Sequence, residues 1–142
     1  MGIVAAELPG ARVLDLFAGS GALGLEALSR GASRATFVEQ DAKAITTLRA
    51  NLAALGGADR ADVFRTDAVK FAAALTANAY DVAFADPPYG KGFAKAVAEA
   101  FAAVPFAALL CIEHGKDDTL PTLAGARTRR YGDTYLTFIP AP

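Results

Sequence analysis

The 142-residue sequence has few of the residues that build disulfide-linked or metal-dependent proteins. It contains one cysteine, Cys111, one histidine, His114, and no tryptophan. A single cysteine cannot form a disulfide within the chain, and one cysteine with one histidine cannot assemble a zinc cluster or a redox pair. This composition suits a reducing compartment, so we expect a cytoplasmic protein without a bound metal.

Long apolar runs and an excess of positive charge are lacking too. No hydrophobic stretch approaches the roughly 18 residues of a membrane span, and no charged leader precedes an apolar segment with a cleavage site. We therefore expect neither membrane insertion nor a targeting signal. The 14 basic and 15 acidic residues give a formal net charge of −1. This balance argues against a nucleic-acid partner, because phosphate contacts usually require an excess of Lys and Arg.

Apolar residues, in contrast, are plentiful. Hydrophobic residues make up 54% of the chain and charged residues 20%, which is enough to bury a core and too apolar for a disordered protein. The length fits one folding unit, since domains usually span roughly 100–200 residues. We expect residues 1–142 to form a single domain and the protein to be a monomer.

Apolar, β-prone segments alternate with segments of helical periodicity along most of the chain. Strands are expected at residues 12–17, 35–39, 61–66, 80–85 and 107–113. Helices are expected to begin near Leu23 and to cover residues 41–55, 68–75 and 93–103, with Gly31 and Gly56-Gly57 ending the first two. Strands that alternate with helices imply right-handed crossovers and a parallel sheet covered on both faces.

The end of the chain has a different pattern. Residues 127–131 and 134–139 have the composition of two strands, and Gly132-Asp133 between them is typical of a tight turn. At least one strand should therefore be antiparallel. The first strand is expected only about ten residues into the chain, so we expect little structure before it. The sequence predicts an α/β fold with a mostly parallel sheet and a C-terminal antiparallel hairpin.

A glycine-rich segment follows the first expected strand and opens the first helix. Gly19-Ser20-Gly21-Ala22-Leu23-Gly24 fits the G-x-G-x-x-G pattern, in which glycines permit a sharp turn and let ligand atoms approach the backbone. Alone, the pattern is also that of a strand-to-helix turn that only packs tightly. Asp15, just before the loop, would repel a pyrophosphate but attract an ammonium or sulfonium group. A cationic ligand is therefore favoured over a dinucleotide.

Two further carboxylates are expected at the same edge of the sheet. Glu39 ends the second strand, where it could accept hydrogen bonds from both ribose hydroxyls of a nucleoside; alternatively, it is a solvated acid. Asp67 ends the third strand, where it could accept a hydrogen bond from an adenine amino group while the Ala68 N–H serves a ring nitrogen. Asp67 is equally suited to cap the helix that begins at Ala68.

The most specific segment is Asp86-Pro87-Pro88-Tyr89, after the fourth strand. Two consecutive prolines remove two backbone donors and fix φ, so the carbonyls of Asp86 and Pro87 are rigid and free to accept from a substrate N–H. A base amino group has two such hydrogens, and acceptors that draw both out of plane would aim its lone pair at an electrophilic methyl. Tyr89 offers a flat face on which an extruded base can stack. The alternative is a Pro-rich turn that leaves the sheet.

These segments together resemble the bacterial 16S ribosomal RNA guanine-N2 methyltransferases that modify guanine 966. The resemblance covers nearly the whole chain. It lies in residues 14–32 (LDLFAGSGALGLEALSRGA), in Val38-Glu39, Asn51-Leu52, Asp67-Ala68 and Asp86-Pro87-Pro88-Tyr89, in Glu113, and in Tyr131-Gly132-Asp133-Thr134.

The resemblance implies a Rossmann-like class I methyltransferase fold with seven strands, the last pair a reversed hairpin, and helices on both faces. It implies S-adenosylmethionine as cofactor and direct in-line transfer to N2 of a guanine in 16S rRNA or an assembling small ribosomal subunit, without a metal. The cofactor residues it implies are Asp15, Phe17, Gly19, Ser20, Gly21, Gly24, Glu39, Gln40, Asp67, Ala68 and Asp86. The residues implied for the target guanine are Asp86, Pro87, Pro88 and Tyr89.

Members of that family usually carry a basic segment and a helix before the first strand, and this sequence has no counterpart of them. One alternative is therefore a protein that binds S-adenosylmethionine but is catalytically weak. The concentrated basic residues are Arg127, Arg129 and Arg130, with Lys91 and Lys95 just beyond Tyr89. They either contact phosphates flanking a flipped base or are ordinary solvated charges.

The single histidine and the single cysteine each allow a simple interpretation, and two other enzyme classes share the motifs above. His114 could act as a general base at a strand end, although no partner for it is visible, and Cys111 fits a small core residue. An N6-adenine DNA methyltransferase would use the same Asp-Pro-Pro-Tyr chemistry, but no segment is long enough for a separate DNA-recognition domain. An NAD-dependent oxidoreductase would use the same glycine loop, but we find no residue suited to hydride transfer.

Overall fold

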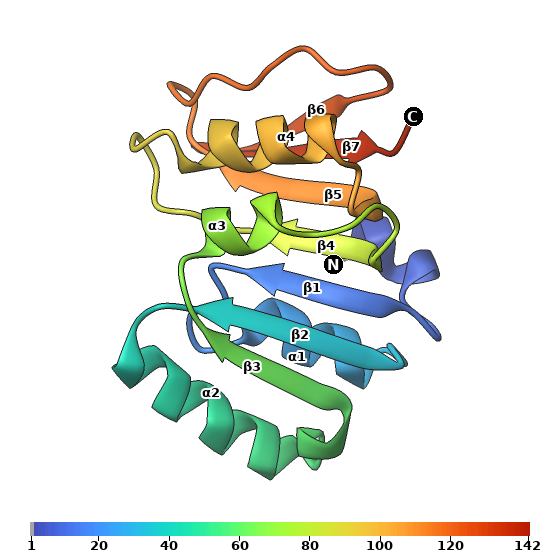
Figure 1. The fold of residues 1–142 in the computed structure, drawn as a ribbon, viewed down its shortest axis with the longest axis vertical. Coiled ribbons are helices and arrows are strands. Elements are labelled where there is room, and N and C mark those ends of the chain that lie inside the picture. The colour runs from blue at the N-terminus through green and yellow to red at the C-terminus, as the bar shows by residue number, and fades with distance from the viewer. Residues whose placement is uncertain (1) are drawn as a thin grey trace.

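The computed structural model describes residues 2–142, with side chains from Val4 onward, and places a seven-stranded sheet at the centre (Figure 1). The strand order is β3-β2-β1-β4-β5-β7-β6. β1 to β5 are parallel to one another, while β7 runs antiparallel to both β5 and β6. The strands are β1 (Arg12–Leu16), β2 (Arg34–Glu39), β3 (Ala61–Arg65), β4 (Tyr80–Ala85), β5 (Ala107–His114), β6 (Arg127–Tyr131) and β7 (Thr134–Pro140).

Four α-helices within residues 2–142 cover both faces of this sheet, which confirms the predicted fold class. The helices are α1 (Ala22–Ser29), α2 (Ala42–Leu55), α3 (Ala68–Ala73) and α4 (Phe93–Ala103). In Figure 1, α3 and α4 lie in front of the sheet and α1 lies behind it. Buried residues of α1 and α2 share one core cluster with Phe37 and Phe84, whereas α3 and α4 share the other with Leu110 and Ile112. None of the helices described is long and apolar enough to cross a bilayer.

Side-chain caps explain where two helices begin. Asp41 accepts a hydrogen bond from the Ala44 N–H at 3.1 Å and caps α2, and Asp67 caps α3 in the same way. Gly56 has a left-handed φ of 76° and ends α2, as the sequence predicts. Helix α3 ends two residues before the predicted position, where the Leu75 N–H bonds to the Ala72 carbonyl three residues back and the α-helical pattern stops.

A short 3-10 helix, η1 (Gly2–Glu7), precedes β1 and differs from the expectation of little structure there. Val4 in η1 and Leu8 just after it are buried in the cluster shared by α1 and α2. A six-residue 3-10 segment is too short to show a hydrophobic period, which is why the sequence pattern misses it. A second such turn, η2 (Ala58–Arg60), leads into β3.

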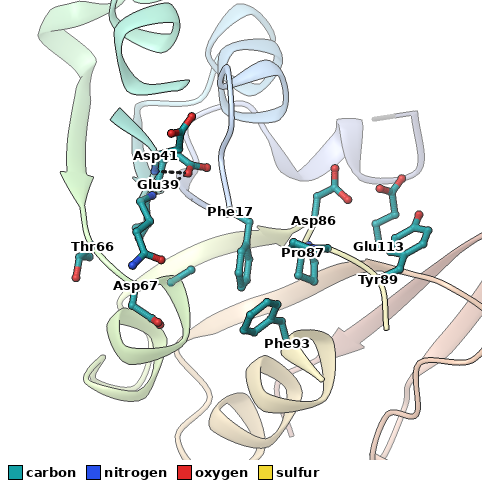
Figure 2. A pocket seen from close by; sticks show the side chains of 14 residues that line it. Phe17, Glu39, Asp41, Thr66, Asp67, Asp86, Pro87, Tyr89, Phe93 and Glu113 are labelled. Carbon is teal, nitrogen blue, oxygen red and sulfur yellow. Dashed lines mark hydrogen bonds between the residues drawn. The ribbon is translucent and has the colours of Figure 1, made fainter. Parts of the chain in front are cut away.

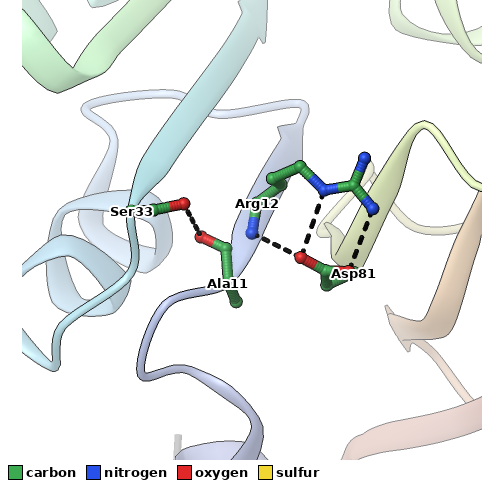
Figure 3. A network of polar contacts seen from close by, with 4 residues as sticks. All are labelled: Ala11, Arg12, Ser33 and Asp81. Carbon is green, nitrogen blue, oxygen red and sulfur yellow. Dashed lines mark hydrogen bonds and ion pairs between the residues drawn. The ribbon is translucent and has the colours of Figure 1, made fainter.

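An ion pair joins β1 to β4 at the amino end of the sheet (Figure 3). Asp81 Oδ2 accepts from the Arg12 backbone N–H at 2.8 Å, and Asp81 Oδ1 accepts from the Arg12 guanidinium at 3.1 Å. The guanidinium hydrogen bond lowers the pKa of Asp81. Nearby, the Ser33 hydroxyl donates to the Ala11 carbonyl at 3.0 Å. Both partners of the ion pair are about half exposed, so solvent screens their attraction and the pair adds little to stability.

The opposite, carboxyl edge of the sheet contains a topological switch. After β1 the chain builds β2 and β3 on one side, then returns to place β4 and β5 on the other. Loops that leave β1 and β4 therefore diverge at this edge. In open α/β sheets such a point leaves a crevice suited to a ligand.

Candidate functional site

A cavity of about 720 Å³ opens at the carboxyl edge, where the loops after β1 and β4 diverge (Figure 2). In Figure 2, Glu39 and Asp41 lie on one side, Asp86, Glu113 and Tyr89 on the other, and the rings of Phe17 and Phe93 between them. We call this space the first cavity. Its lining residues are Phe17, Val38, Glu39, Gln40, Asp41, Thr66, Asp67, Ala68, Asp86, Pro87, Pro88, Tyr89, Phe93 and Glu113.

The glycine loop takes its shape from two left-handed residues and one close contact. Gly19 and Gly21 have φ values of 59° and 88°, a region that glycine enters without steric cost. Gly24 lies in α1 against Phe37 of β2, and a Cβ at Gly24 would come 2.3 Å from a ring carbon of Phe37. The third glycine of the pattern thus serves helix–strand packing. None of the loop glycines is among the residues that line the first cavity.

Asp15 lies beneath this loop and not in the cavity wall. Its side chain is 1% exposed, and its Oδ2 accepts from the Gly24 N–H at 3.0 Å. Burial raises the pKa of Asp15 to about 8, so the carboxyl is largely protonated at neutral pH in the unliganded protein. A cation bound at the loop would favour its ionised form.

Glu39 fastens the loop to the end of β2. Its Oε1 accepts from the Gly19 N–H at 2.8 Å, and its Oε2 accepts from the N–H groups of Gln40 and Asp41, each at 2.8 Å. The carboxylate also lines the first cavity. It is positioned for ribose hydroxyls, which would have to share its oxygens with these backbone donors.

Asp67 combines the two functions that the sequence left open. Its Oδ1 accepts from the Lys70 N–H at 3.0 Å and so caps α3, while the residue lines the first cavity together with Ala68. The cap uses only one carboxylate oxygen. The other is available to a ligand amino group.

The segment after β4 is held at both ends. Pro87 is buried, whereas Tyr89 is 44% exposed and donates from its hydroxyl to Thr134 Oγ1 at 3.3 Å. Asp118 accepts from the N–H groups of Gly90 and Gly115 at 2.9 and 2.8 Å, which ties this loop to the end of β5. The segment is therefore supported from two neighbouring strands.

Glu113 is a cavity residue to which the sequence pattern assigned no function. It follows Ile112, which pairs with Ala85 in the register of β4 and β5, so Glu113 lies next to Asp86. Partial burial and the neighbouring Glu113 carboxylate raise the pKa of Asp86 to about 7. An acidic residue near the end of the fifth strand was the available sequence signal. Asp41, Thr66 and Phe93 are further lining residues that the sequence did not indicate.

The remaining candidates lie outside the first cavity. Five of them are exposed basic residues: Arg127, Arg129 and Arg130 on the edge strand β6, and Lys91 and Lys95 near the start of α4.

His114 is buried, with Nε2 2.7 Å from Thr137 Oγ1 and Nδ1 3.1 Å from the Gly115 carbonyl oxygen. Cys111 is buried too, which raises the pKa of its thiol to about 12. Within residues 2–142, no three His, Cys, Asp or Glu side chains cluster as metal ligands would.

Sequence relatives of this chain carry names of ribosomal RNA methyltransferases. The Bacillus subtilis protein named "Putative rRNA methyltransferase YlbH" is 38% identical over 131 residues, which cover 89% of this chain and 71% of that protein. "Ribosomal RNA small subunit methyltransferase D" of Escherichia coli is 46% identical over 82 residues, which cover 58% of this chain and 40% of that protein.

Solved structures show the same architecture. The Escherichia coli protein described as "Putative methyltransferase yhhF" matches with a TM-score of 0.84 at 33% identity, over 99% of this chain and 82% of that one. An RNA methyltransferase from Salinibacter ruber, solved with S-adenosyl-L-homocysteine, matches with a TM-score of 0.74 over 99% and 88% of the two chains. Its 14% identity supports the fold alone.

The family model described as "Conserved hypothetical protein 95" matches residues 1–140. This match covers nearly the full length, and the fold is that of the S-adenosylmethionine-dependent methyltransferases. The chain therefore belongs to the conserved hypothetical protein 95 family, together with relatives named as ribosomal RNA methyltransferases.

Proposed function

We propose that this protein transfers a methyl group from S-adenosylmethionine to the exocyclic N2 of a guanine in small-subunit ribosomal RNA. The observation that carries the proposal is the charge of the first cavity. Its lining contains five carboxylates and neither Lys nor Arg, the acids being Glu39, Asp41, Asp67, Asp86 and Glu113. Such a lining suits a cationic nucleoside and disfavours the pyrophosphate of a dinucleotide.

The residues present fit this cofactor. Glu39 would hold the ribose, and Asp67 with the Ala68 N–H would hold the adenine, because these groups end neighbouring strands and line one cavity. Phe17 and Gln40 line the space between. The loop from Gly19 to Gly24, with Ser20 at its tip and Asp15 beneath it, would hold the methionine part.

The chemistry requires positioning and a proton acceptor. When bound, S-adenosylmethionine supplies an electrophilic methyl group on a sulfonium. The carbonyls of Asp86 and Pro87 would accept the two amino hydrogens of the base, and Tyr89 would stack against its ring. Once methylated, the base nitrogen would carry a surplus proton. Asp86, with Glu113 beside it, would accept that proton.

The names of the relatives favour RNA over DNA as substrate. An N6-adenine methyltransferase would require the same acceptors after β4 and remains the second candidate. The weakly active cofactor-binding protein is the third. We also retain the single domain, the monomer and the cytoplasmic location as predictions.

Two measurements test the proposal. Calorimetry with S-adenosylhomocysteine should show one binding site per chain, and Glu39→Ala should weaken the binding of this ligand. Tritiated S-adenosylmethionine should then label small-subunit rRNA, either as a naked transcript or assembled with small-subunit proteins, and digestion should release N2-methylguanosine. Label in DNA and not in RNA would favour the adenine methyltransferase. Binding without transfer to either RNA form would favour the third candidate.

A further inference from the structure

A second cavity, of about 850 Å³, lies on the other side of Asp86 and Glu113 and shares those two residues with the first. Its wall joins the amino-terminal region to the C-terminal hairpin: Leu23 lies on α1, Phe84 on β4, Tyr131 on β6 and Leu136 on β7. Residues that the catalytic proposal does not use therefore surround the far side of the two carboxylates.

The hairpin register places two arginines on the face of this second cavity. Directly opposite residues in antiparallel strands share a face. Tyr131 pairs with Thr134, Arg129 with Leu136 and Arg127 with Phe138. Thr134, Leu136 and Phe138 all line the second cavity. The side chains of Arg127 and Arg129 thus leave β6 on the same side as Tyr131.

Arg130 belongs to the opposite face. It pairs with Tyr135, and its guanidinium lies 5.9 Å from the centre of the Tyr135 ring. Tyr135 stacks on the buried His114 and is not among the residues of the second cavity. Lys95 lies on α4, which covers that same opposite face. The basic residues of the chain therefore do not form one patch.

The second cavity and the strand beside it offer the three kinds of group that one nucleotide needs. Arg127 and Arg129 at the exposed strand can bind phosphate. Tyr131, which is 50% exposed, can stack on a base. The carboxyl groups of Asp86 and Glu113 line the side that this cavity shares with the first. Guanine carries N1–H and N2–H donors on one edge, whereas adenine places an acceptor at N1, which a carboxylate repels.

We infer that the target guanosine enters through the second cavity. Arg127 and Arg129 bind its flanking phosphates, Tyr131 stacks on the base, and Glu113 accepts from the N1–H while Asp86 and Pro87 take the N2 amino group. The inference rests on the proposed function and adds the face from which RNA approaches. It also divides the arginines of β6 into two that bind RNA and one, Arg130, that does not.

Methylation of a small-subunit rRNA transcript with tritiated S-adenosylmethionine tests the inference. Tyr131→Ala should lower kcat/KM about tenfold, whereas Tyr131→Phe should keep most of it, because the ring supplies the stacking. Arg129→Gln should raise KM and reduce the slope of log Kd against log salt by about 0.7. Arg130→Gln should leave that slope unchanged. Arg49→Gln, on the exposed surface of α2 and outside both cavities, is the matched control.

Calorimetry with S-adenosylhomocysteine separates the possible failures. All of these variants should bind it like the wild type, and a Tyr131→Ala protein that does not would show a structural role and overturn the inference. An equal rise of KM in Arg129→Gln and Arg130→Gln would also overturn the inference while the proposed function stands. Normal methyl transfer by both Tyr131→Ala and Arg129→Gln would do the same. A wild type that transfers no methyl group to rRNA would overturn both.

Discussion

Among single residues, Asp86 and Glu113 are central to the proposed reaction, because their adjoining carboxyl groups can accept hydrogen bonds and a proton from the base. They come from neighbouring strands, line both cavities and have no Lys or Arg beside them in either lining. Burial raises the pKa of Asp86 to about 7, and Glu113 adds to this rise because two such groups resist simultaneous ionisation. A substrate that offers several N–H donors would relieve this repulsion.

Glu113→Gln tests the pair. Loss of one charged acceptor should lower kcat about 10- to 100-fold, because hydrogen bonds to charged groups contribute about 1.5–3 kcal/mol. The wild-type rate should rise with pH through about 7 as Asp86 deprotonates. In Glu113→Gln the pKa of Asp86 should fall toward its ordinary value, so the rise should move to lower pH. A pH–rate profile measures this shift, and an unchanged midpoint would contradict the role assigned to Glu113.

Asp15 predicts a pH dependence of stability. Its folded pKa is raised to about 8 by burial, so between about pH 4 and pH 8 the folded protein holds a proton that the unfolded chain has released. This contribution to the free energy of unfolding is complete below pH 4 and is lost as pH rises to 8, at no more than about 1.4 kcal/mol per unit. Asp15→Asn keeps the acceptor for the Gly24 N–H and should lack that slope.

Denaturant unfolding of both proteins at pH 6, 7 and 8 measures the difference. The stability of wild type relative to Asp15→Asn should decline across this range. Parallel pH dependences of the two proteins would show that the Asp15 carboxyl is not held protonated.

At the scale of elements, the contact between α1 and β2 determines the geometry of the glycine loop. Gly24→Ala would press a methyl group into the Phe37 ring, which should cost about 1–3 kcal/mol of stability and weaken S-adenosylhomocysteine binding as the loop shifts. Adding Phe37→Leu should restore part of both losses. Gly57→Ala is the control, because Gly57 has a negative φ of −102° and only ordinary contacts around it.

Thermal unfolding and calorimetry give the two readouts for these variants. Equal losses in Gly24→Ala and Gly57→Ala would mean that the Phe37 contact is not the constraint on the loop. No recovery in the double variant would lead to the same conclusion.

At the scale of the whole molecule, the balance of charge limits how tightly RNA can bind. With a formal net charge of −1 and two arginines on the inferred RNA face, few counterions should be released on binding. For single-stranded RNA we expect log Kd to change with log salt with a slope of about 1.4, which corresponds to two phosphate contacts. Filter binding between 50 and 200 mM salt measures it, and a slope above about 4 would require a larger basic surface than this face offers.

Much of the architecture was predictable because it depends on residues that are close in the sequence. Hydrophobic periodicity located the strands and helices to within a few residues, and Gly56 ended α2 as expected. The double proline after β4 predicts a rigid backbone, because proline fixes φ. The glycines after β1 predict a sharp turn, because glycine adopts a positive φ without steric cost. The short helix η1 was not predicted, because a six-residue 3-10 helix is too short to show a hydrophobic period.

Only the packing of the whole sheet makes distant segments neighbours. The elements, the glycine loop and the Asp86-Pro87-Pro88-Tyr89 segment are predictable from the sequence, because each arises from local backbone preference and side-chain type. The pairing of Glu113 with Asp86, the burial of Asp15 beneath its loop, and the position of Arg129 on the face of the second cavity depend on strand order and register. Those follow from how the whole sheet packs, and contacts between distant strands are not encoded in any one segment.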